Sequence, residues 1–354
     1  MKFDFAIGNP PYQEETADIS STNGQAPRKN VFHYFQMEAD KIAQEGTVLI
    51  YPGGRWIHQS GKGLKQFGKD LINDVTLSQI EYYPDSRDVF GSAAELTDGI
   101  TIVSKKHNKQ TEGFEYSFIQ GANKETVHAD NPGEELMPLD PKDLKIIHKV
   151  KAFVEKNDIG FLHNKILPRS LFNIESDFVQ KNPNSVRIYT SDKDIDYSKE
   201  IKLLTNDKAG AAGRSMWFVA NKELITTNQA YISEWQVAVS SAHAGGQSGR
   251  SNQIEIIDNH SAFGRARVAL RSFTTEKEAQ NFFNYANAYL IKFTFLMTAE
   301  ALSSLAKLVP DVDNYSDSNS LIDFSQNIDN QLFKMVELTE EEISYIKNRV
   351  DGNR

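Results

Sequence analysis

The chain has 354 residues, of which 39% are hydrophobic, and it carries a formal net charge of −9. It contains no cysteine, which excludes disulfides, thiolate metal sites and a cysteine nucleophile. Because it shows neither a secretory leader nor an apolar run long enough to cross a membrane, we expect a folded, cytoplasmic protein of two domains.

The first hundred residues alternate between strand and helix patterns. The predicted elements are a strand at 3–8, a helix at 31–43, a buried strand at 47–51, an amphipathic helix at 62–73 and a strand at 75–82. The pair Asp98-Gly99 predicts a hairpin between strands at 94–97 and 100–105. This order predicts an α/β fold with a mostly parallel sheet and an antiparallel end.

The pattern changes beyond residue 105. A strand at 114–120 precedes the turn-rich stretch "GANKETVHADNPGEELMP" and a helix at 142–156. Short β-like runs follow at 186–190, 216–220, 235–240, 254–257 and 267–273. The last part is helical, with a long helix at 275–298 and a helix at 339–350 that starts in the capping-box spacing of Thr339 and Glu342. We therefore divide the chain into 1–120, a linker and boundary helix at 121–159, a second domain at 160–275 and a helical region at 276–354.

The first predicted strand runs directly into Asn9-Pro10-Pro11-Tyr12. The two prolines remove backbone donors and fix the chain, so the Asn9 amide oxygen and the Pro10 carbonyl can both act as acceptors. Two acceptors are what an exocyclic amino group requires, and Tyr12 offers a ring on which a base can stack. The alternative interpretation is an ordinary proline-rich turn that ends a strand.

The segment "FDFAIGNPPYQ" resembles the catalytic motif of adenine-specific DNA methyltransferases of the gamma class, from type II restriction-modification systems. The resemblance continues through "GTVLIYPGGRWIHQSGKGLKQFGKDLI", "DSRDVFGSAAELTDGITIVSKK" and the region after residue 240. It implies catalytic roles for Asn9, Pro10, Pro11 and Tyr12. It also implies that Tyr12 and Phe90 stack on the flipped adenine, whereas an ordinary core position is the alternative for Phe90.

The same resemblance implies an incomplete Rossmann-like methyltransferase sheet with an antiparallel hairpin end, an α+β target-recognition domain at 160–275 and a helical tail. It also implies S-adenosylmethionine as cofactor, although the Gly-rich turn and acidic ribose ligand of that half are absent; "NDKAGAAGRSMW" and "HSAFGRARV" match neither. Three explanations stay open: a split enzyme whose partner chain brings the cofactor half, a truncated relic, or a DNA-recognition protein without turnover.

The resemblance implies double-stranded DNA as the partner. The net charge is −7 over residues 1–148, +4 over 149–274 and −6 over 275–354, and a basic middle region suits a polyanion, although an excess of this size also arises by chance. Arg, Asn and Gln side chains suit base edges and phosphates, although solvated loops explain them as well. The candidates for DNA contact are Arg214, Arg250, Ser251, Asn252, Gln253, Arg265, Arg267 and Arg271.

Other chemistries find less support in the sequence. "DKDIDYSKEIK" offers Asp194, Glu200 and Lys202 to a nuclease reading, but a charged turn explains that stretch better. The eight histidines show no metal-ligand spacing, so we expect no metal site. A nuclease on an associated chain stays open. The three tryptophans are expected in cores: Trp56, Trp217 and Trp235.

Overall fold

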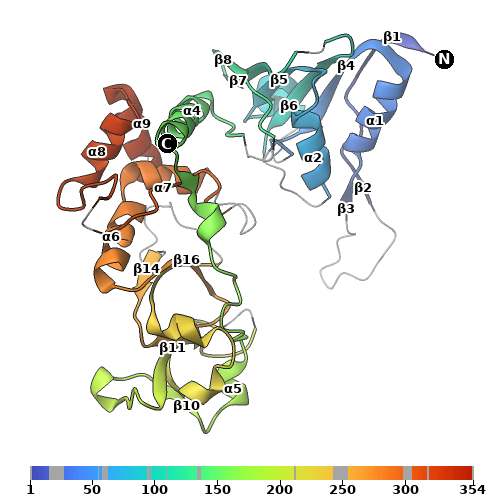
Figure 1. The fold of residues 1–354 in the computed structure, drawn as a ribbon. Helices are drawn as coiled ribbons and strands as arrows, with labels where there is room; N and C mark the ends of the chain where they lie inside the picture. The colour runs from blue at the N-terminus through green and yellow to red at the C-terminus, as the bar shows by residue number, and fades with distance from the viewer. Residues whose placement is uncertain are drawn as a thin grey trace. The chain divides into compact units, whose positions relative to one another are not determined.

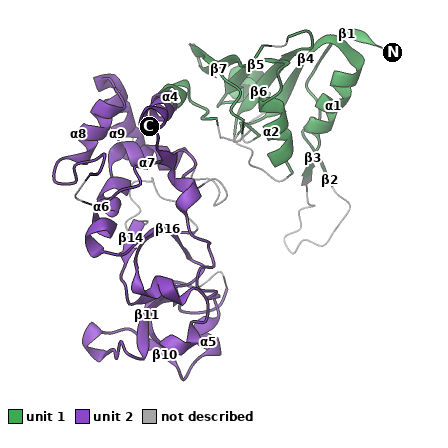
Figure 2. Cartoon of the chain, in the orientation of Figure 1, with its two compact units in different colours: residues 1–145 green, residues 146–354 purple. Residues whose placement is uncertain are grey.

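The structure is a computed structural model that describes residues 2–15, 28–54, 56–57, 63–93, 96, 98–109, 111–133, 137–210, 213–241, 254–297, 305–316 and 319–352. Its contacts divide the chain into two compact units, Met1–Lys145 and Ile146–Arg354 (Figure 2). The division falls within helix α4 (Pro141–Lys156), the helix predicted at the boundary.

The first unit is built on a six-stranded sheet in the order β1-β4-β6-β5-β7-β8 (Figure 1). Its elements are β1 (Phe3–Gly8), β2 (Gln13–Glu15), β3 (Arg28–Asn30), α1 (Phe32–Ile42), β4 (Ala43–Pro52), α2 (Lys65–Ile72), β5 (Leu77–Tyr83), α3 (Arg87–Phe90), β6 (Ile100–Lys106), β7 (Phe114–Gln120) and β8 (Asn123–Ala129). This mixed sheet with helices confirms the predicted α/β class.

The expectation of a mostly parallel sheet was wrong. β1 pairs with β4 and β5 pairs with β7 in parallel, but the other three neighbouring pairs are antiparallel. The reason is β6, which lies between β4 and β5 and runs against both. Most of the strand predicted at 94–97 as its hairpin partner lies outside the described residues.

The described helices of this unit cover one face of the sheet. Residues paired across the strands share a face, and the buried members Leu49, Val103, Ile80 and Tyr116 lie on the side of α1 and α2. On this side Trp56 is fully buried and donates its Nε1–H to the Thr101 hydroxyl at 2.9 Å, which confirms its predicted core position.

The opposite face carries no described helix, and its side chains are half-buried or exposed except for Ser117, which is fully buried. Near β1 it is apolar, because Ile7 is paired with Val48 and Ile50 with Ile102. Towards β5 and β7 it becomes polar. We call this the open face, and its other members are Phe5, Gln79, Glu81, Ser104, Glu115 and Ser117.

The second unit combines two small sheets with C-terminal helices (Figure 1). The sheets have the orders β10-β12-β11-β15 and β14-β13-β16, and β9 pairs with β17. The elements are β9 (Gly160–Phe161), α5 (Phe178–Lys181), β10 (Val186–Ile188), β11 (Glu200–Asn206), β12 (Ser215–Asn221), β13 (Trp235–Ser240), β14 (Ile254–Ile257), β15 (Ser261–Phe263), β16 (Arg267–Phe273), α6 (Glu276–Ala286), α7 (Tyr289–Leu296), β17 (Pro310–Asp311), α8 (Ile328–Met335) and α9 (Glu340–Val350).

Two hydrophobic cores stabilise this unit. The first surrounds Phe218 and Phe263 of the four-stranded sheet. The second joins Val237 of β13 and Leu270 of β16 to the helices α4 and α6 to α9. The predicted recognition segment and the helical tail therefore share one core, although their boundary at residue 275 stays a prediction.

Several local predictions can be compared directly with the structure. The five short runs predicted between 186 and 273 are confirmed as strands, and Thr339 forms the predicted capping box with Glu342. Two predictions were wrong. The stretch predicted as turn-rich contains β8, and the long helix predicted at 275–298 is interrupted at Asn287 and Ala288 between α6 and α7.

Candidate base-binding site and nucleic-acid interface

The Asn9-Pro10-Pro11-Tyr12 segment leaves the sheet at the carboxyl end of β1. Gly8 is the last residue paired with β4, and Asn9 follows it with an exposed side chain. The Tyr12 carbonyl accepts a hydrogen bond from the Val31 N–H at 3.0 Å, which fixes the far end of the segment before α1. The exposed Asn9 side chain thus lies at a proline-fixed turn, where its amide oxygen can accept a hydrogen bond from a ligand.

The Tyr12 ring is half-buried and packs against the core of the first unit. Its hydroxyl is buried without a hydrogen-bond partner, and burial raises the pKa of Tyr12. The Asn9 side chain is near enough to oppose that rise, but the two groups lack hydrogen-bond geometry. A buried hydroxyl without a hydrogen-bond partner is costly, and a role in a functional site is one explanation for it.

Topology places Phe90 at the same edge of the sheet as Asn9. β1, β4 and β5 all run in one direction, so the residues after each strand emerge at a common edge, as ligand-binding residues do in open α/β sheets. β4 and β6 lie between β1 and β5, which puts the two strand ends roughly 14 Å apart, three strand spacings.

Phe90 is the last residue of α3 and is half-buried. It is not among the side chains that pack on the core of the first unit, which disfavours the core alternative. Its turn is anchored on both sides. The Arg87 side chain bonds Asp85 and lowers the pKa of that carboxyl to about 2, and Asp88 accepts the Gly121 N–H at 2.8 Å.

A hollow of about 260 Å³ opens beside Asn9. Its lining comes from β1, α1 and β4 and is mostly apolar: Gly8, Asn9, Pro10, Phe35, Glu38, Ala39, Ile42 and Leu49. S-adenosylmethionine needs partners for an ammonium, a carboxylate, a ribose and an adenine. The hollow is smaller than ordinary ligand pockets and offers only two polar side chains, so these residues do not form a complete site for that cofactor.

Two of the predicted DNA contacts, Arg214 and Arg265, are exposed on loops of the second unit that lie close to each other. Arg214 precedes β12, and its backbone N–H donates to the Asp207 carboxylate at 2.7 Å. Arg265 follows β15 and pairs with Glu175 at 2.6 Å on the surface. Gly264, next to it, donates to the Leu204 carbonyl of the strand that leads into the Arg214 turn.

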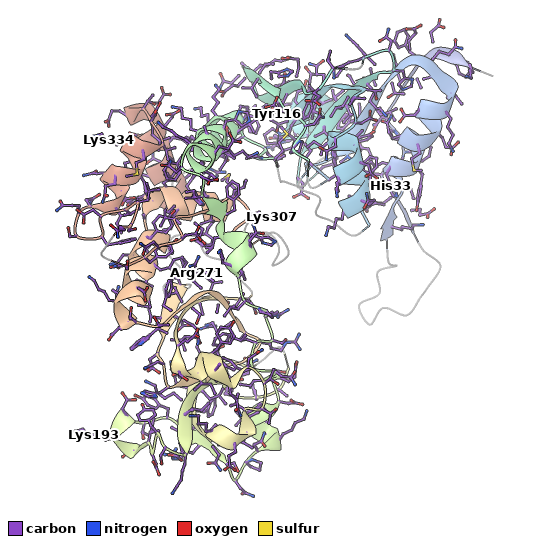
Figure 3. The ribbon with its side chains drawn as sticks, in the orientation of Figure 1. His33, Tyr116, Lys193, Arg271, Lys307 and Lys334 are labelled. Atoms are coloured by element: carbon purple, nitrogen blue, oxygen red, sulfur yellow. The ribbon has the colours of Figure 1, made fainter. Side chains whose placement is uncertain are left out.

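The other two predicted arginine contacts that the structure describes are half-buried in ion pairs. Arg267 pairs with Glu255. Arg271, which Figure 3 labels, pairs with the buried Asp311 and lies over the ring of Tyr315. Both arginine side chains are only 14–15% exposed. The remaining predicted contacts lie outside the described residues: Arg250, Ser251, Asn252 and Gln253.

Arg169 is a candidate that the sequence did not indicate. It is exposed, and its guanidinium donates to the Arg265 carbonyl at 3.1 Å and to the Ser241 hydroxyl at 3.4 Å. It therefore lies with Arg265 where β13 leads into the Gly-rich segment. No local pattern marks it, because its partners are 72 and 96 residues away.

The residues considered for a nuclease site, Asp194, Glu200 and Lys202, do not form one cluster. Lys202 pairs with Asp192 and Asp258, and Glu200 pairs with Arg187 instead. Among the described residues, no group of three acidic or histidine side chains is arranged to hold a metal ion. Within the same residues, none of the helices has the length and apolar character needed to cross a bilayer.

The beginning of the chain is similar in sequence to known proteins. Residues 1–90 match the family described as Eco57I restriction-modification methylase. An uncharacterized adenine-specific methylase of Mycoplasma pneumoniae is 29% identical over 110 residues, which are 31% of this chain and 25% of that protein. The first quarter of the chain is therefore similar to restriction-modification methylases, which confirms the predicted resemblance in this general form.

Two solved restriction-modification enzymes align along nearly the whole chain. The alignment with the type IIG restriction endonuclease BpuSI includes 98% of this chain and 53% of the BpuSI chain, with 11% sequence identity and a TM-score of 0.37. The alignment with the type IIL restriction-modification enzyme MmeI, solved in complex with DNA, includes 99% of this chain and 54% of the MmeI chain, with 8% sequence identity and a TM-score of 0.32. This chain thus spans about half the length of each solved enzyme and a quarter of the length of the Mycoplasma pneumoniae methylase. TM-scores of 0.37 and 0.32 are too low to support a structural argument.

Proposed function

We propose that this chain is the base-holding and DNA-recognition portion of an adenine-specific (N6) DNA methyltransferase of a restriction-modification system. The observation that carries the proposal is the exposed Asn9 at a proline-fixed turn on the carboxyl edge of the sheet, with the segment up to residue 90 similar to restriction-modification methylases. In this proposal S-adenosylmethionine is the methyl donor, and the described residues that line the hollow beside Asn9 supply only part of a site for it.

In this proposal, Asn9 and Pro10 act on the amino group of a flipped adenine. The Asn9 amide oxygen and the Pro10 carbonyl accept its two protons, which orients the nitrogen and its lone pair. Tyr12 and Phe90 hold the base ring between them. Flipping is required because the amino group cannot reach such a turn from within the duplex.

The second unit supplies the DNA contacts. Arg169, Arg214 and Arg265 are exposed on loops that converge near β15, and guanidinium groups suit both phosphates and guanine edges. We do not assign DNA contacts to Arg267 and Arg271, because their partners are buried or half-buried carboxylates of the same unit.

Methyl transfer from labelled S-adenosylmethionine to unmethylated DNA tests the function. The purified chain is assayed alone and with the polypeptide encoded immediately upstream of it. We expect incorporation only in the mixture, and Asn9→Ala should lower it by about 100-fold or more, as losses of positioned polar groups do. Asn123→Ala, at an exposed position of β8, is the matched control and should leave the rate unchanged.

A second candidate is a DNA-recognition protein without turnover, which the incomplete hollow beside Asn9 favours. It predicts sequence-specific DNA binding with no incorporation in either mixture, and Asn9→Ala would then change nothing measurable. Specific binding without methylation would therefore replace the proposed function with this one.

A further inference from the structure

The three exposed arginines near β15 differ in how their charge is balanced. The Arg265 guanidinium pairs with the Glu175 carboxylate at 2.6 Å, so its charge is already compensated on the surface. The Arg214 side chain has no partner among the described residues, and only its backbone is held. Arg169 is held by its guanidinium, but its partners are uncharged. The three arginines are therefore not equivalent towards DNA.

The Arg169 guanidinium keeps its full charge because neither of its partners is a carboxylate. Its Nε–H donates to the Arg265 carbonyl at 3.1 Å, and its Nη2 donates to the Ser241 hydroxyl at 3.4 Å. In the part of the chain that the structure describes, no carboxylate pairs with Arg169, and the neighbouring Glu175 is taken by Arg265. An exposed arginine that is held in place without a counter-ion is prepared to bind an anion.

The free donors of Arg169 suit a phosphate in particular. A guanidinium group carries five N–H donors in one plane, and Arg169 uses one on Nε and one on Nη2. Both donors of Nη1 and one of Nη2 remain, and these two nitrogens form the fork that binds two oxygens of a phosphate side by side. The bonds to the protein therefore occupy one edge of the group and leave the outer edge for a ligand.

The groups that hold Arg169 are fixed by further contacts. The Ser241 N–H donates to the Ala266 carbonyl at 2.8 Å. Gly264 lies so close to β11 that a Cβ on it would come within 2.6 Å of the Thr205 hydroxyl, which holds this turn tightly against the sheet. The Arg169 fork thus has a defined position before an anion arrives, and less conformational entropy is lost on binding.

We infer that Arg169 binds one backbone phosphate of duplex DNA through Nη1 and Nη2 and thereby sets the position of the second unit along the DNA. Phosphate contacts fix register and orientation but carry no sequence information. Arg214, whose guanidinium is bound to no described group, stays available for a base edge. This inference rests on the proposed function in one respect, because that function supplies DNA as the source of the phosphate.

The salt dependence of DNA binding tests this contact without methyl transfer and without a known recognition sequence. The full chain is titrated onto a labelled duplex of mixed sequence, about 30 base pairs long, at salt concentrations from about 50 to about 200 mM. Each phosphate contact contributes about 0.9 to the slope of log affinity against log salt. We expect Arg169→Met to make the slope shallower by about 0.9 and to weaken binding about 10-fold at the lowest salt concentration.

Arg187→Met is the matched control. Arg187 is an exposed arginine of the same unit, and Glu200 compensates its charge at 3.1 Å. It lies on β10, at the opposite edge of the four-stranded sheet from β15. This variant changes the net charge by the same amount as Arg169→Met, and it should leave both the affinity and the slope unchanged. Circular dichroism verifies that both variants fold.

Arg169→Lys separates a phosphate contact from a purely structural role. An ammonium still neutralises one phosphate, so this variant should keep the native slope and recover most of the affinity that Arg169→Met loses. If only the bonds to Arg265 and Ser241 mattered, both substitutions would weaken binding equally and neither would change the slope. That result would overturn the inference.

The remaining outcomes distinguish the inference from the proposed function. An unchanged slope in Arg169→Met, or an equal change in Arg187→Met, overturns the inference while DNA binding by the native chain survives. Tighter, Arg169-dependent binding of an RNA duplex overturns it by assigning the phosphate to RNA. A native chain that binds no duplex removes both the inference and the DNA-recognition role. A slope that depends on Arg169 in a chain without methyl transfer supports the inference and removes the methyltransferase.

Discussion

Replacement of Asp311 by asparagine should destabilise the second unit by about 3 kcal/mol. Asp311 is 1% exposed and accepts hydrogen bonds from Arg271, from the Tyr315 hydroxyl at 2.9 Å and from the Asp313 N–H at 3.1 Å. The neutral amide leaves the half-buried Arg271 charge with only the exposed Asp313 carboxylate, 3.9 Å away, as a counter-ion. Loss of one partner of a buried pair costs about 3–5 kcal/mol, and the low end applies because the amide oxygen still accepts a bond.

Urea unfolding followed by circular dichroism measures this change. Asp313→Asn is the matched control, because its carboxylate is 56% exposed and 3.9 Å from Arg271. Asparagine also tolerates the positive φ of 60° at that position, so the control should lose less than about 1 kcal/mol. Equal losses in both variants would refute the structural role of the pair and return Arg271 to the candidates for DNA contact.

Three further predictions concern local geometry. Thr339→Ala should destabilise α9 by about 1 kcal/mol, measured by urea unfolding, because it removes the capping side chain. Gly99→Ala should cost at least about 2 kcal/mol, since φ is 70° and the new Cβ would lie 2.0 Å from a carbonyl of the neighbouring strand; Gly121→Ala, with φ 58° and open space, should cost about 1 kcal/mol. Arg87→Met should raise the Asp85 pKa from about 2 towards 3.8 in an NMR titration; the native bond is present above pH 4 and is lost as the pH falls towards 2, and an unchanged pKa would contradict the assignment.

The sequence predicted the elements whose signals are local. β1, α1, α4 and the capping box at Thr339 follow from apolar spacing and cap residues within a few positions, and all are present. The place of β6 was not predictable in this way, because its two neighbours are decided by pairing across the sheet. β8 was missed because its alternating residues are mostly polar, which resembles a turn-rich segment.

The candidate site shows the same division. Asn9 to Tyr12 are contiguous, so the sequence alone shows them as one motif. The position of Phe90 at the same edge depends on the order of four strands, β1-β4-β6-β5. For the DNA contacts, residue type alone did not distinguish Arg265, which is on the surface, from Arg271, whose partner is 40 residues away. Arg169 was not found because only tertiary contacts bring it to this loop.

The antiparallel strand β6 between β4 and β5 also determines which fragments of the chain contain the whole sheet and when the sheet can form during translation. The segment that matches the methylase family ends at residue 90, ten residues before β6 begins. A fragment of that length contains β4 and β5 but not the strand that hydrogen-bonds to both, so neither would have its inner neighbour. During translation, the sheet can close only after residue 106 has left the ribosome, and an expression fragment of this unit must extend to Ala129 to include β8.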